Sequence, residues 1–237
     1  MKRPRLALAA LAAAAVLVTL LAPPVRQDQA YHRFADGRGF LGVPNFLDVV
    51  SNLPFAVVGG LGLARSLRGR SWERAGFAAV FAAVGLTAFG SAYYHLAPDD
   101  ARLFWDRLPI AIVAMALLAV TIADRIDARL GRRLLAPLVA AGVAGAVWWR
   151  ETGDLRFYAL VQFFPALAIP VMLLWLPARH TRNREMWTVL GLWAVSRVCE
   201  VLDAQIFALS GVASGHTLKH LAAAGAAYWM LRVARTE

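Results

Sequence analysis

Three histidines have the residue type and the spacing to bind a metal ion. His216 and His220 lie four residues apart, so in a helix both imidazoles project from one face, about one turn apart. His95 ends a separate apolar segment. The membrane topology that the charges indicate places His95 at the same depth as His216 and His220. Three imidazoles with a fourth position open to water form a ligand set typical of catalytic zinc. By itself, the pair also fits histidines at a helix cap or at the membrane interface.

A hydroxyl and a carboxylate lie close to His95 in the sequence. Ser91 precedes His95 by four residues, and Asp106 follows it after a short connection. In a metal-assisted hydrolysis a carboxylate can transfer the proton of the attacking water, while a hydroxyl steadies the developing oxyanion. Taken singly, Ser91 also suits close helix packing and Asp106 suits a helix N-cap.

The elements that carry these residues are predicted to be membrane helices. Of the 237 residues, 59% are hydrophobic and 17% are charged, whereas soluble domains have about 45–50% apolar and 25% charged residues. This composition excludes a soluble enzyme, a disordered chain and a collagen. Long apolar runs also argue against a β-barrel, whose strands are short and alternating. Most of the runs approach the roughly 20 residues that cross a bilayer; they cover 5–22, 46–64, 76–94, 105–122, 134–149, 157–176, 186–207 and 214–231.

We therefore expect an all-α fold, a polytopic membrane helical bundle with a seven-helix core and one extra N-terminal transmembrane segment. Residues 1–44 would form the first span and an outer loop, 45–233 the core, and 234–237 a cytoplasmic tail. The first run resembles a signal peptide but lacks a clear small-x-small cleavage site, which favours an uncleaved anchor. Within the spans, three prolines are expected to kink their helices: Pro54, Pro165 and Pro170.

The net charge of +10 is explained by topology. With the N-terminus in the cytoplasm, the inner segments carry more than twice as many Lys and Arg as the outer ones. This asymmetry is the positive-inside rule. It predicts that both termini are cytoplasmic and that the histidine site lies toward the outer face; we expect the membrane to be a bacterial inner membrane. Nucleic acid is not an expected partner, and no obligate protein partner is evident.

Other polar residues within or near the spans need an explanation. Arg197, Glu200 and Asp203 follow one another at three-residue spacing, and Lys219 lies at a matching depth. They form either an ion-pair network between helices or a shell that orients the histidines or binds a substrate. The single cysteine, Cys199, excludes disulfides and a cysteine-rich zinc site. Two further histidines are expected away from the site: His32 exposed in an outer loop, and His180 in an inner loop.

The candidate residues resemble a known motif. Ser91, His95, Asp106 and the His216 and His220 pair are similar to the motif of the alkaline ceramidases and of the wider membrane-hydrolase superfamily that includes the adiponectin and progestin receptors. Matching stretches are DVVSN at 48–52, GSAYYHL at 90–96 and WDRLP at 105–109, and the resemblance covers about 45–233. It implies that the three histidines and a water hold Zn²⁺, that Asp106 handles that water's proton, and that Ser91 lies beside the substrate carbonyl.

The resemblance also implies a substrate, the membrane-embedded amide of a ceramide-like lipid, cleaved to a fatty acid and a long-chain amine. Substrate contacts or a shell around the metal ligands would come from Asn52, Glu200, Asp203 and Lys219. Ceramidases also bind Ca²⁺ through an acidic N-terminal cluster. Here its candidates are Asp36, Asn45 and Asp48, and the chain departs from the family because Asn45 stands where the ceramidases have a glutamate.

Three other functions remain open from the sequence. The first is a receptor-like or scaffolding seven-helix protein with structural zinc and negligible turnover, but a structural metal needs neither Ser91 nor Asp106. The second is a haem-binding electron carrier, although axial ligands approach from opposite faces and not as a pair on one helix. The third is a transporter, suggested by the charged residues within the spans.

Overall fold

The computed structural model describes the backbone of residues 2–235 and the side chains of residues 5–235. The last two residues of the expected tail, 236 and 237, lie outside it. The described chain is helical; apart from two isolated bridges it contains no β-structure. Its elements are α1 (Lys2–Leu21), η1 (Gln29–His32), α2 (Phe46–Val50), α3 (Leu53–Leu67), α4 (Arg74–Leu96), α5 (Asp100–Arg125), α6 (Ala128–Thr152), α7 (Arg156–Trp175), α8 (Asn183–Val201), α9 (Asp203–Ser210) and α10 (Gly215–Val233).

Five helical segments of the described chain are long and apolar enough to cross a membrane. They are Phe46–Leu67, which joins α2 and α3, and the helices α4, α5, α6 and α7. A shorter apolar helix covers Arg5–Leu21. Helices α8 and α10 are more polar, since Arg197 and Glu200 lie in one and Lys219 in the other. The all-helical class is therefore confirmed, and the described chain has helices that could cross a membrane.

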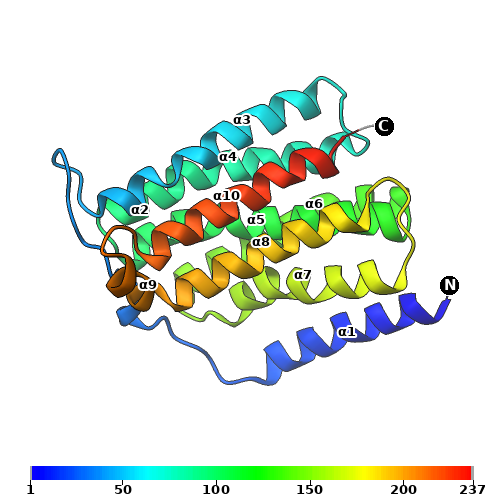
Figure 1. The fold of residues 1–237 in the computed structure, drawn as a ribbon. Helices are drawn as coiled ribbons and strands as arrows, with labels where there is room; N and C mark the ends of the chain where they lie inside the picture. Colours follow the sequence, from blue (N-terminus) through cyan, green and yellow to red (C-terminus); the bar gives the residue numbers. More distant parts are fainter. Residues whose placement is uncertain (1, 236–237) are drawn as a thin grey trace.

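The long helices run back and forth along one direction (Figure 1). Both ends of the described chain lie at one end of the bundle, while α9 and the 22–45 connection lie at the opposite end. Helix α4 packs between α3 and α5, and α10 packs on α8 and also contacts α3. Helix α1 lies at the edge and packs on α7.

Two glycines allow close helix contacts beside the histidines. A Cβ at Gly90 of α4 would overlap the carbonyl oxygen of Trp105 in α5, and a Cβ at Gly215 would overlap the carbonyl oxygen of Cys199. Small residues at such contacts let membrane helices approach closely. As a result, the end of α4 is held against the start of α5, and the start of α10 against the end of α8.

Two expected spans are interrupted in the structure. The run 186–207 divides at Leu202 into α8 and α9, because Asp203 uses its carboxylate to bind the backbone of other segments, as described below. The run 46–64 is interrupted at Ser51 and Asn52. Pro54 consequently lies in the first turn of α3, where proline fits a helix without kinking it; Pro165 and Pro170 do lie inside α7.

A buried polar cluster closes the end of the bundle that holds the chain termini. One carboxylate oxygen of Asp124 accepts hydrogen bonds from the backbone N–H groups of Arg179 and His180. The His180 ring stacks on Trp72, with ring centroids 4.7 Å apart. As expected from the sequence, His180 lies far from the other histidines.

Candidate metal centre

The three predicted ligands meet at one point. Among the described residues, His95, His216 and His220 form a group in which one ring nitrogen from each lies within 4.8 Å of the others. His95 comes from the last turn of α4, and the other two come from the first turns of α10. All three side chains are buried. The i,i+4 spacing and the close packing around Gly90 and Gly215 together produce this convergence.

His95 shows most clearly that the site fits a metal ion. Neither of its ring nitrogens has a hydrogen-bond partner, and both are buried. Buried polar atoms in proteins are almost always hydrogen-bonded, so an orphaned imidazole calls for an explanation. A metal ion would take the lone pair of one nitrogen. Imidazole nitrogens suit zinc, copper, iron and nickel.

A serine that sequence analysis did not select orients one of these histidines. The Oγ of Ser51 lies 2.8 Å from Nδ1 of His220 and 3.2 Å from the carbonyl oxygen of Asp48. Metal-binding histidines commonly use their second ring nitrogen in such a bond. Ser51 belongs to the stretch 48–52, but only the fold reveals that it faces α10.

Two carboxylates lie beside the histidines, that of Asp48 buried and that of Asp203 partly buried. Asp48 accepts hydrogen bonds from the hydroxyls of Thr217 and Ser214, at 2.6 and 3.4 Å, while its Oδ2 has no partner. Asp203 accepts from the backbone N–H of His216 at 2.7 Å and, through Oδ2, from that of Ala35. Within the described chain neither carboxylate forms an ion pair with a basic side chain. Their negative charge favours a cation in this place.

The three calcium candidates have separate partners. The Arg38 guanidinium binds both carboxylate oxygens of Asp36 at 2.7 and 2.8 Å and holds the pKa of this carboxyl below its usual value. Asn45 donates to the carbonyl oxygen of His95 at 2.8 Å. Asp48 is bound by the hydroxyls on α10. The hydrogen bonds of these three side chains thus go to other parts of the chain and not to one another, and calcium binding stays a prediction.

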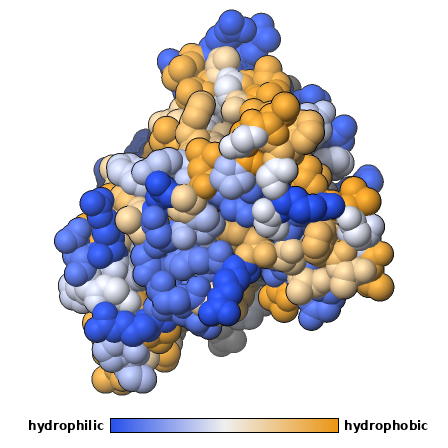
Figure 2. Space-filling view, turned by 90° about the vertical axis from the view of Figure 1, so that its left-hand side faces the viewer, coloured by the Kyte–Doolittle hydropathy of each residue, from blue (hydrophilic) through white to orange (hydrophobic). Residues whose placement is uncertain are grey.

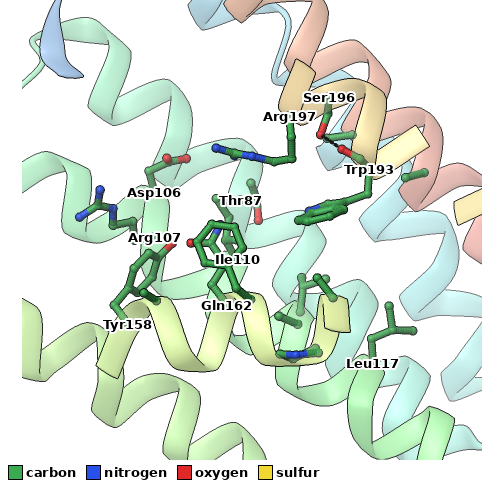
Figure 3. Close-up of a pocket in the computed structure, with 18 of the residues that line it drawn as sticks. Thr87, Asp106, Arg107, Ile110, Leu117, Tyr158, Gln162, Trp193, Ser196 and Arg197 are labelled. Carbon is green, nitrogen blue, oxygen red and sulfur yellow. Dashed lines mark hydrogen bonds between the residues drawn. The ribbon is translucent and has the colours of Figure 1, made fainter. Parts of the chain in front are cut away.

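Ser91 and Asp106 line a cavity of about 610 Å³, which His220 also lines. Both side chains are buried, and neither makes a side-chain hydrogen bond within the described chain. The carboxylate of Asp106 points toward Arg197 across the cavity (Figure 3). The hydroxyl and the carboxylate are thus available to a molecule bound beside the histidines.

Of the expected ion-pair network, the part around Glu200 is present, while Asp203 forms no ion pair within the described chain. Its carboxylate pairs with Arg197 of the same helix and with Lys219 of α10, whose Nζ lies at 2.6 Å. Tyr31 also donates to it, at 3.1 Å. Lys219 Nζ lies 3.4 Å from Nε2 of His216, so the network reaches the histidines. Asn52 differs from these residues because it donates to the carbonyl oxygen of Asp48 and so stabilises the interruption between α2 and α3.

The cavity continues from the polar site into an apolar region between α7 and α8. Leu117, Ile169 and Met230 line this part, and Trp193 presents its indole to the cavity (Figure 3). Helices α7 and α8 contact each other only sparsely. The volume is within the usual range of about 300–1,000 Å³ for small-molecule sites. The role of Trp193 could not be recognised in an apolar run.

His32 is not the exposed loop residue that the sequence suggested. Its Nδ1 lies 2.9 Å from the hydroxyl of Tyr94, and its Nε2 lies 3.1 Å from Asp100. These bonds hold the 22–45 connection over the end of α4. Figure 2 shows this end of the bundle: hydrophilic residues gather over its centre and left, with hydrophobic residues above and to the right.

The fold and the site define an all-helical protein with helices long and apolar enough for a membrane and a candidate trihistidine metal centre at one end. Residues 48–237 match a family of unknown function (DUF6962), and the chain belongs to this family. The match begins within α2, so that α1 and the whole 22–45 connection precede it. Among curated proteins, the chain finds no match.

Proposed function

We propose that the protein is a zinc-dependent membrane amidohydrolase that cleaves the amide bond of a lipid, as its resemblance to the alkaline ceramidases implies. The main support is the convergence of His95, His216 and His220 next to a long, largely apolar cavity that Ser91 and Asp106 also line. Three imidazoles with room for water favour zinc in a catalytic role. The apolar part of the cavity would hold an acyl chain.

The residues of the chain have distinct roles in this proposal. The three histidines would hold the ion, which lowers the pKa of water and stabilises negative charge on a carbonyl oxygen. Asp106 takes a proton from the attacking water and returns it to the amide nitrogen. Ser91 donates a hydrogen bond to the carbonyl oxygen as charge develops there. The C–N bond breaks, a C–O bond forms, and the products are a fatty acid and an amine.

The proposed topology has seven core spans and one additional N-terminal span. Figure 1 supports an even number of crossings, because both ends of the described chain lie on the same side. The excess of Lys and Arg in the segments on that side supports a cytoplasmic location for both ends of the chain. The membrane in this proposal is a bacterial inner membrane. The polar helices α8 and α10 count as spans because Glu200 neutralises charge between them. The histidines then lie toward the outer face.

Entry from the bilayer is the route that suits this substrate. The cavity lies between α7 and α8, and these two helices make few contacts with each other. A lipid could therefore move sideways between them, keeping its acyl chain in hydrocarbon while the amide reaches the histidines near the interface.

Metal analysis of the detergent-purified protein tests this proposal. Wild type should contain about one zinc ion per chain and release fatty acid from at least one member of a panel of lipid amides. His216→Ala/His220→Ala should lose zinc and hydrolysis together. His180→Ala, which changes a histidine at the other end of the bundle, should keep both.

Two outcomes would contradict it. A wild-type protein without bound metal would overturn the metal centre. Zinc without hydrolysis of any amide in the panel would overturn the enzymatic function and favour a receptor-like protein with structural zinc.

A further inference from the structure

The basic side chains that line the cavity are not all neutralised. Arg156 pairs with Asp154 at 2.8 Å, and two others share the carboxylate of Glu200. Of the four basic side chains that line the cavity, Arg107 alone has no carboxylate partner within the described chain. The four are Arg107, Arg156, Arg197 and Lys219.

The environment of Arg107 is built to hold a guanidinium but leaves part of it unsatisfied. The side chain is buried, with 7% of the residue exposed. Its Nη2 donates to Gln27, while its Nη1 is buried with no hydrogen-bond partner. The guanidinium carbon lies 4.2 Å from the ring centroid of Trp149 and 4.9 Å from that of Tyr158. The rings stabilise the charge, but they do not replace a hydrogen-bond acceptor.

A buried cation without a counter-ion is costly, and an unsatisfied N–H group adds to this cost. An anionic group of a bound molecule would remove both penalties. The planar fork of an arginine suits a carboxylate or a phosphate better than a lysine would. Figure 3 shows Arg107 beside Tyr158, while the carboxylate of the preceding Asp106 is directed the other way, toward Arg197.

We propose that Arg107 binds the carboxylate of an N-acyl amino acid, whose amide the protein hydrolyses. This inference rests on the proposed function. Arg107 directly follows Asp106 in α5, and both residues line the same cavity. In an N-acyl amino acid the carboxylate is two bonds from the amide nitrogen that Asp106 protonates. A neutral sphingoid base has no anion at this position. Hydrolysis adds one water and gives a fatty acid and an amino acid, with no other reactant.

Binding of N-palmitoylglycine and of its methyl ester separates this proposal from the hydrolase proposal. The two ligands differ in the charge of the carboxyl group and share the amide and the acyl chain. Binding is measured to wild type and to the inactive His216→Ala/His220→Ala protein, so that it does not depend on turnover. The acid should bind about ten- to a hundredfold more tightly than the ester in both proteins.

Variants of Arg107 assign this preference to one residue. Arg107→Gln should remove it, and Arg107→Lys should reduce it while keeping the charge, which provides a second variant if the first fails to fold. Arg102→Gln is the matched control, because Arg102 lies on the same helix outside the cavity and should leave the preference unchanged.

Equal binding of acid and ester to wild type would overturn the inference. A preference that persists in folded Arg107→Gln would also overturn it, as would tighter binding of N-palmitoyl phosphoethanolamine than of the acid, which would indicate a phosphate site. Preferred binding of the acid without hydrolysis of any amide would instead support the anion site and contradict the proposed hydrolase.

Discussion

The hydroxyl of Ser51 lies between the carbonyl oxygen of Asp48 and Nδ1 of His220. When Ser51 donates its proton to this carbonyl oxygen, its own oxygen can accept a hydrogen bond from Nδ1–H, the tautomer that we infer. This arrangement leaves Nε2 of His220 unprotonated and available as a metal ligand. Ser51, which would not contact the metal itself, thus favours the tautomer of His220 that can bind a metal ion.

Replacing Ser51 should weaken metal binding without preventing folding. Ser51→Ala removes the acceptor of Nδ1–H, and loss of such a partner typically lowers metal affinity about 10- to 100-fold. Competition with a chromophoric chelator measures the change. Ser66→Ala, at another buried serine whose hydroxyl binds the carbonyl oxygen of Gly62, should keep the wild-type affinity. Equal affinity of both variants would contradict the role of Ser51.

Asp106→Asn should separate proton transfer from metal binding. The amide cannot accept the proton of water, so hydrolysis should fall by about 10²- to 10⁴-fold. Zinc content should stay the same because the three histidines remain. Glu151→Gln, at an exposed carboxylate of α6, serves as the control and should be active. Activity of Asp106→Asn close to wild type would exclude Asp106 as the proton carrier.

Gly90→Ala should disturb the contact that brings His95 toward Asp106. The added Cβ would overlap the carbonyl oxygen of Trp105, and such overpacking typically costs about 1–3 kcal/mol. Thermal unfolding in detergent and fatty-acid release should both report the loss. Gly85→Ala, on the same helix, meets only an ordinary contact with Gly59. If the two variants unfolded at the same temperature, this contact would not be critical.

Asp154 gives a pH dependence outside the membrane segments. Hydrogen bonds from Arg156 hold its pKa well below the ordinary value of 3.8. The carboxylate therefore contributes stability above that value, and the contribution is lost as the pH falls toward the folded-state pKa. Asp154→Asn should melt below wild type at neutral pH, and the difference should shrink below about pH 4. Glu151→Gln, an exposed neighbour, should show no such trend. A constant difference across this range would contradict the assignment.

The sequence was sufficient to find the histidines because membrane segments contain few polar residues. His216 and His220 share a helix face by spacing alone, and the turn after His95 is too short to separate it far from Asp106. The helical class followed from the same apolar runs. In each case the information is local in the chain.

The roles that sequence analysis missed depend on contacts between distant segments. Ser51 faces His220 only because α2 stops short and the chain turns before α3. Asp203 could not be recognised as a helix breaker, since its partners His216 and Ala35 come from other parts of the chain. That Arg107 has no carboxylate partner within the described chain also depends on the fold, because the fold decides which carboxylates lie near it.

The ion pairs of Glu200 also bear on how the protein enters the membrane during synthesis. In the proposed topology α8 and α10 are both spans, and a charged side chain would cost up to about 2.5–3.5 kcal/mol in translocon-mediated insertion, the full amount applying at the centre of an isolated span. Helix α8 carries Arg197 and Glu200, and Lys219 arrives only with α10. The two helices should therefore insert as one hairpin after the translation of α10, so a chain truncated before α10 should leave α8 poorly inserted.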